Sequence, residues 1–128
     1  MTDWNNKKEV LAAVKQGDGT LESASKELKA DKEVVLAAVK AWGYDLENAS
    51  KELKADKEVV LVAIQNSHGS ALEYASEELR ADKEVVLAAL NQLKEQQSSS
   101  FEFRIIFNYA SKELKNDPEF MKEVEQYL

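Results

Sequence analysis

The sequence contains no cysteine, a single histidine and a single proline among its 128 residues. Without cysteine the chain has no disulfide bonds, no thiolate nucleophile and no cysteine-ligated zinc. His68 is the lone imidazole. The chain offers it no second histidine as a metal ligand and no Gly-x-Ser-x-Gly motif with a serine nucleophile that it could activate. Because proline and glycine are scarce, few residues would interrupt a helix. These absences predict a largely helical protein that is not an enzyme and uses no metal or cofactor.

Basic residues are also in deficit, since 17 lysines and arginines face 24 aspartates and glutamates, with a net charge of −7. An acidic surface repels a phosphate backbone, so we expect no nucleic-acid partner. No basic run suggests a membrane surface, and the longest apolar runs, such as residues 59–64, are too short to span a bilayer. The N-terminus has no signal-peptide pattern. We therefore expect a soluble chain, cytoplasmic in the cell that makes it, with no membrane partner.

What the sequence does contain is an internal repeat. The segment DKEVVLAAV begins at Asp31 and returns, with small changes, from Asp56 and from Asp82. A second segment alternates with it and reads LESASKELKAD, LENASKELKAD and LEYASEELRAD in successive copies. Looser copies, KEVLAAV and NYASKELKND, precede and follow these. The period is about 25 residues and lengthens to about 35 in the last unit, where residues 92–105 form an insertion.

Each period is predicted to hold two helices joined by a turn. The first helix would be capped by the aspartate before each KEVV run. At the end of the chain the cap would be Asp117, followed by Pro118 at the first helical position. A turn containing Gly17, Gly43 or Gly69 would follow.

The second helix is expected to begin at a capping residue, Thr20, Asp45 or Ser70, the last of these in a capping box with Glu73. Its apolar stripe would come from leucine and alanine at positions i, i+3 and i+7. The serine of each Ala-Ser pair would lie inside this helix and bond back to a carbonyl one turn earlier.

Helices of about ten residues are marginal in water when isolated, so each unit must bury its stripe against the next. We predict an all-α, right-handed, α-solenoid-like array in one domain, 1–128, with about four helix–turn–helix units at 6–30, 31–55, 56–81 and 82–116 and a capping helix at 118–128. A continuous coiled coil is the competing interpretation, but the glycine turns and a period that is not a heptad multiple argue against it. Trp4 is expected to cover the first unit. The buried side of the last helix is expected to comprise Phe120, Met121, Val124 and Leu128.

The run DKEVVLAAVK, then a glycine-containing turn, then LExASxEL(K/R)xD resembles the bacterial repeat family catalogued as domain of unknown function 4116. The resemblance extends from about Lys7 to Asp117 and is most specific in the three central units. It implies a small helical-repeat fold and relatives that include large secreted effectors of intracellular bacteria. If this chain is part of such an effector, it would be secreted into a host cell. The family supplies no functional residues to carry over.

The turns between the two helices of each unit vary, whereas the helices are nearly identical. Equivalent turns of a solenoid lie along one edge, and variable turns on a constant frame are typical of a binding surface. The candidate protein-binding edge consists of Trp42, Tyr44, His68, Phe101 and Phe103, and its aromatic residues are of the types that dominate interfaces. The alternative is that these aromatic side chains close the core between units or dock an insertion helix at 101–115.

The sequence thus favours a non-enzymatic module that binds a protein or peptide through this edge. An alternative from a different class is a structural scaffold that self-associates, since very similar units can stack between chains. An enzyme would need polar groups converging around His68 or the glutamates, and no motif for this is present.

Overall fold

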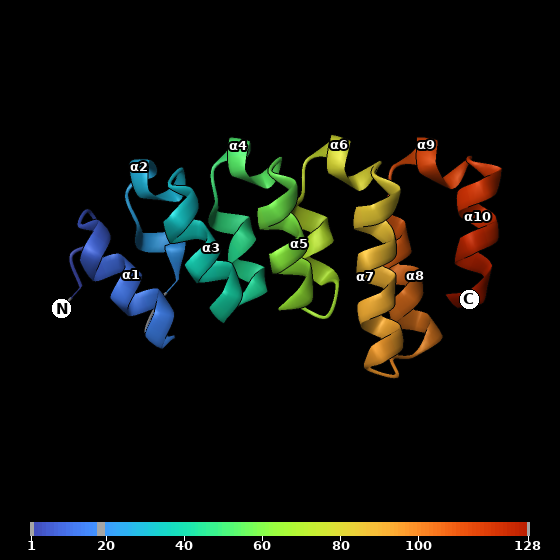
Figure 1. The fold of residues 1–128 in the computed structure, drawn as a ribbon, viewed down its shortest axis with the longest axis horizontal. Coiled ribbons are helices and arrows are strands. Elements are labelled where there is room, and N and C mark those ends of the chain that lie inside the picture. Colours follow the sequence, from blue (N-terminus) through green and yellow to red (C-terminus); the bar gives the residue numbers. More distant parts are fainter. Residues whose placement is uncertain (1, 18–19, 128) are drawn as a thin grey trace.

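In the computed structural model, which describes residues 2–17 and 20–127, the chain forms an extended row of short helices with its ends on opposite sides (Figure 1). All regular structure in these residues is helical. The prediction of an all-α array of repeated units is therefore confirmed. The expected burial of Leu128 lies outside the described residues.

The first helix of each unit contributes to one layer of the array. In chain order these are α1 (Lys7–Gln16), α3 (Lys32–Ala41), α5 (Lys57–Gln65) and α7 (Lys83–Glu95), each packed on the next, with α10 (Pro118–Val124) at the end of the row (Figure 1). Each helix is preceded by an N-cap residue whose side chain accepts a hydrogen bond from a backbone N–H of the first turn. The caps are Asn6, Asp31, Asp56, Asp82 and Asp117. The predicted aspartate caps are confirmed, and they set where each helix starts.

The second half of each unit is not the single helix that we predicted. It begins with a 3₁₀ turn and continues as a four-residue α-helix. The turns are η1 (Leu21–Ser23), η2 (Gly43–Asn48) and η3 (Ser70–Tyr74), and the short helices are α2 (Lys26–Lys29), α4 (Lys51–Lys54) and α6 (Glu77–Arg80). The Ala-Ser pair between them is extended, with ψ of 159° at both Ala49 and Ser50. The expectation that these serines lie inside a helix is wrong.

A hydrogen bond to the preceding unit interrupts the helix at this serine. The backbone N–H of Ser50 donates to the carbonyl of Lys29 at 2.9 Å, so it is not available to a carbonyl of its own helix. The Ser50 hydroxyl then caps α4 by accepting the N–H of Leu53 at 3.3 Å. The backbone bond recurs along the array from Ser25 to Trp4, from Ser76 to Lys54 and from Ser111 to Arg80. Tertiary bonding therefore overrides the helical spacing of the leucines.

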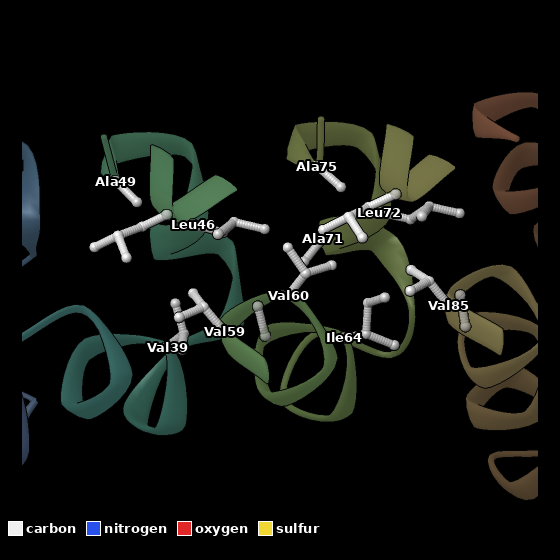
Figure 2. Packing of buried hydrophobic residues seen from close by; sticks show 14 of the residues in the cluster. Val39, Leu46, Ala49, Val59, Val60, Ile64, Ala71, Leu72, Ala75 and Val85 are labelled. Carbon is white, nitrogen blue, oxygen red and sulfur yellow. The ribbon is translucent and has the colours of Figure 1, made fainter. Parts of the chain in front are cut away.

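The core lies between the layer of long helices and the layer of 3₁₀ turns. Figure 2 shows Leu46 and Leu72 on the turn side of the core and Val59 and Ile64 of α5 on the other side, and all four side chains are fully buried. The same buried cluster runs from the first unit to the last. Each unit therefore shares its core with its neighbours, as expected for repeats whose helices are too short to stand alone.

The last unit replaces the 3₁₀ turn with a helix. After α7, a turn leads into α8 (Ser100–Tyr109), which packs against α7 and η3, and α9 (Lys112–Lys115) follows. The predicted continuous helix at 101–115 is wrong, because the chain is extended at Ala110 and Ser111. A capping box exists at Ser99 and Glu102, whereas the one predicted at Ser70 is wrong because Ser70 lies within η3.

The two ends of the array are covered as predicted. Trp4 is half-buried against the core at the first unit. At the other end Phe120 and Val124 are buried and Met121 is partly so. The ring of Phe107 on α8 stacks on Phe120 with centroids 6.4 Å apart. A short 3₁₀ turn, η4 (Glu125–Tyr127), follows α10.

A ladder of ion pairs, which sequence reasoning missed, joins the units. The ammonium group of Lys32 lies 3.0 Å from Asp56 Oδ2 and 2.9 Å from Glu58 Oε1, so it bridges the cap and first turn of the next helix. Equivalent contacts to the following unit are made by Lys7, Lys57 and Lys83. The signal was present in the sequence, because every DKE triplet supplies one lysine donor and two carboxylate acceptors.

The ladder lowers the pKa of all four cap aspartates below the ordinary value of 3.8. The lysine hydrogen bond is the largest cause for Asp31 and for Asp117. At Asp56 and Asp82 partial burial acts in the opposite direction, but the lysine and the backbone N–H donors outweigh it. A carboxylate with a lowered folded-state pKa contributes stability that is present above 3.8 and lost as the pH falls through the folded-state value.

We therefore expect the urea midpoint of unfolding to fall as the pH is lowered from about 5 to about 2. A variant with asparagine in place of the four cap aspartates keeps a capping side chain but has no carboxylate to protonate there. Its urea midpoint should depend less on pH over this range. Equal pH dependence of the two proteins would contradict a role for the ladder. The substituted positions are Asp31, Asp56, Asp82 and Asp117.

Candidate protein-binding edge

The ends of α1, α3, α5 and α7 lie along one edge of the array, opposite the edge that carries α2, α4, α6 and α9 (Figure 1). The segments that differ most between units follow these ends. The prediction that the variable turns share an edge is therefore confirmed for the described residues.

Trp42 and Tyr44 lie where α3 passes into η2, and both are exposed, by 51% and 38%. Their rings meet edge to face at 65°, with centroids 6.0 Å apart. The hydroxyl groups of Tyr44 and of Ser70, from the next unit, are hydrogen-bonded to each other at 2.9 Å. Neither ring closes the core, so the alternative interpretation of these two residues is wrong.

These two rings line an open cleft of ≈ 470 Å³ between the second half-units of the array. Tyr74 of η3 adds a third ring, and Glu22 and Glu47 add carboxylates. The remaining lining residues are Thr20, Asp45 and Asn48. The cleft thus joins three consecutive units.

Asp45 lines this cleft and is only 2% exposed. Its two carboxylate oxygens lie 3.1 and 3.0 Å from the backbone nitrogen of Leu21, whose N–H donates to them. The side-chain amide of Asn48 donates to the same carboxylate at 2.9 Å. The prediction that Asp45 caps its own second helix is wrong, because its carboxylate instead serves the start of η1 in the preceding unit.

Burial and neighbouring carboxylates both shift the pKa values of the titratable groups around the cleft. Burial is the largest cause that raises the pKa of Tyr74, and the carboxylates of Glu47 and Glu73 raise it further. Burial likewise raises the pKa of Asp45, with smaller contributions from Glu22 and Glu47, although its hydrogen-bond donors act in the opposite direction. The pKa of Tyr109 is also raised, by burial and then by Glu73. Burial and the nearby glutamates therefore both disfavour a negative charge on these groups.

The insertion presents a second apolar surface. Phe101 is 71% exposed, and Ile105, one helical turn later on α8, is 37% exposed. Phe103 is only 7% exposed, so its inclusion in the binding edge is wrong. It faces the opposite side of α8, where its ring lies 5.9 Å from that of Tyr127. The spacing of Phe101 and Ile105 by four residues could have indicated the exposed pair in the sequence.

His68 is exposed in the turn after α5, with a positive φ of 54°. Counted back from the leucine that follows, it occupies in the third unit the position of Trp42 in the second. No side-chain hydrogen bond or ion pair of His68 is formed with the described part of the chain. The position therefore varies between units on a constant frame.

No group of three or more metal-ligating side chains occurs among residues 2–17 and 20–127. Within the same ranges, none of the helices has both the length and the apolar character needed to cross a membrane.

The stacked units, shared core and inter-unit bonds define a helical-repeat protein. The chain belongs to the family described as Domain of unknown function (DUF4116), whose sequence model matches residues 6–54, 31–68 and 56–104. The resemblance stated from the repeat motifs is confirmed. The matches end within α8, so the rest of the altered last unit lies beyond them. No curated protein and no solved structure matches the chain.

Proposed function

We propose that this chain is a non-enzymatic module that binds a protein or peptide through two exposed surfaces, the one formed by Trp42 and Tyr44 and the one formed by Phe101 and Ile105. These four are the large apolar side chains that are exposed among the described residues. All four belong to segments that vary between units, and none belongs to the repeated frame. Exposed aromatic residues on a rigid scaffold are the usual anchors of protein interfaces. The proposal therefore rests on the confinement of exposed apolar side chains to the variable segments.

A non-enzymatic role is supported by the uses of the titratable groups. The four cap aspartates are engaged in helix capping and in the ion-pair ladder. Asp45, the buried carboxylate, holds backbone and amide donors of its neighbours. These perturbed groups therefore have structural partners, which weakens the case that they serve catalysis.

A protein partner is favoured over nucleic acid because the net charge is −7 and the cleft itself is lined by carboxylates. A self-associating scaffold has less support. Asn6 and Lys8 stand where later units have aspartate and glutamate, and Pro118 stands where earlier units have the ladder lysine. Two copies stacked end to end would therefore lack the ion pairs that join units within the chain.

Substituting Trp42 and Phe101 together with alanine is expected to reduce partner capture about tenfold or more, because interface anchors carry most of the binding energy. Capture would be measured by quantitative mass spectrometry of proteins retained from a lysate of the source cells. The Lys26→Ala/Lys51→Ala variant, altered on the opposite edge, serves as control and should retain every partner. If the edge variant remains folded and captures the same proteins in the same amounts, the proposed edge is wrong.

A further inference from the structure

The cleft at Trp42 has two aromatic faces held in a fixed corner. The rings of Trp42 and Tyr44 are inclined at 65°, and both remain accessible to solvent. The hydrogen bond between the Ser70 and Tyr44 hydroxyls holds the tyrosine ring in place before any ligand arrives, and the Trp42 ring packs against it edge to face. Preorganised aromatic surfaces lose little conformational entropy on binding.

Carboxylates surround this aromatic corner. Glu22 and Glu47 line the cleft, and no basic residue is among the described residues that line it. Glu73 lies close enough to affect Tyr74, another lining residue. Glu22 and Glu47 are themselves exposed and take part in no ion pair within the described chain. Their charge is therefore available to a ligand.

The chemistry of the lining selects among partners. An anionic group would be repelled by Glu22 and Glu47. A purely apolar group would cover the rings but would also remove water from these carboxylates without replacing it. A cation placed over an indole or phenol face is attracted by the ring, most strongly by tryptophan, and would also pair with the carboxylates. Charge complementarity therefore favours a cationic occupant.

We propose that this cleft receives the side chain of an arginine or lysine from an exposed basic segment of a partner protein. The inference rests on the proposed protein-binding role and specifies the partner's chemistry at this site. Trp42 and Tyr44 supply the ring faces, and Glu22 and Glu47 supply the opposite charge. The apolar surface of Phe101 and Ile105 is not part of this contact.

The experiment measures fluorescence anisotropy of a labelled peptide, (Gly-Ser-Arg)₃, with the full chain at about 0.15 M salt, where the Debye length is about 8 Å. A lysine version distinguishes the two cations, and a glutamine version should not bind. We expect Trp42→Ala and, separately, Glu22→Gln/Glu47→Gln to weaken binding about tenfold each. Trp42→Leu keeps apolar bulk without a π face and should weaken binding severalfold. In a Trp4→Phe background, the fluorescence of Trp42 should change as the peptide binds.

The matched control is Glu27→Gln/Glu52→Gln, which removes the same charge from α2 and α4 on the opposite edge. It should leave affinity within about twofold, since exposed charges beyond a Debye length are screened. If it weakens binding as much as Glu22→Gln/Glu47→Gln does, attraction is general and the proposal is overturned. It is also overturned if Trp42→Leu binds as the original chain does, or if neither cationic peptide binds. In that last case, loss of lysate partners in the Trp42→Ala/Phe101→Ala variant would leave the broader binding role standing.

Discussion

Replacing Gly43 with alanine is expected to lower the free energy of unfolding by about 3 kcal/mol, because the added methyl group has no space. A Cβ at this position would collide with the carbonyl oxygen of Ala63 and lie 2.8 Å from the backbone of Asn66. Both belong to the next unit, and Gly43 donates its N–H to the Asn66 carbonyl at 3.1 Å. Backbone atoms do not move aside as a flexible side chain does, so the two units would have to separate.

Gly17 provides the matched control for this substitution. Its φ of 74° is unfavourable for alanine, but a Cβ there would meet no described atom within 4 Å. Gly17→Ala should therefore cost only about 1 kcal/mol, the usual conformational penalty. Urea unfolding followed by circular dichroism measures both variants. Equal losses at Gly43 and Gly17 would mean that close approach between units is not what Gly43 provides.

Replacing Asp45 with alanine is expected to cost about 3 kcal/mol, because the N–H of Leu21 and the amide of Asn48 would both lose a buried acceptor. Asp45→Asn keeps an oxygen acceptor without the charge and should cost about 1 kcal/mol or less at neutral pH. Thermal and urea unfolding of the two variants would test this difference. An alanine variant as stable as the asparagine variant would show that the acceptor is dispensable.

The pH dependence of stability that Asp45 contributes should be opposite in sign to that of the cap aspartates, and Asp45→Asn tests this. Burial raises the pKa of Asp45 above 3.8, so the folded state holds this proton more readily than the unfolded chain. The stability contribution of this group is present below 3.8 and is lost as the pH rises through the folded-state pKa. The asparagine of Asp45→Asn has no proton to lose. The free energy of unfolding of this variant, measured relative to that of the original chain, should therefore increase as the pH rises.

Local chemistry was enough to predict the first helix of each unit. An aspartate before an apolar run can cap a helix wherever it is found, and Asp31, Asp56 and Asp82 do so. The sequence also placed Trp42 and Phe101 in variable segments, but it left open whether their side chains are exposed or close the core. The form of the second half-unit was not predicted, because leucine spacing alone does not distinguish one helix from a 3₁₀ turn followed by a short α-helix.

Two site predictions failed for related reasons. Asp45 has the residue type of a helix cap, but the donor that it serves is in another unit, 24 positions earlier. Phe103 is aromatic and lies in the insertion, as Phe101 does, yet the two occupy opposite sides of α8. Which side of α8 is covered depends on α7 and on Tyr127, and neither contact can be read from the insertion itself.

The amino-acid sequence by itself determined the period, the helical class, the aspartate caps of the first helices and the need for neighbouring units, because these can be read from patterns within one unit. Only the tertiary structure decided where the second half-unit bends, which lysine meets which carboxylate, and which aromatic rings remain in water. Those outcomes depend on backbone groups and side chains about 25 residues apart, which come into contact only when the units stack.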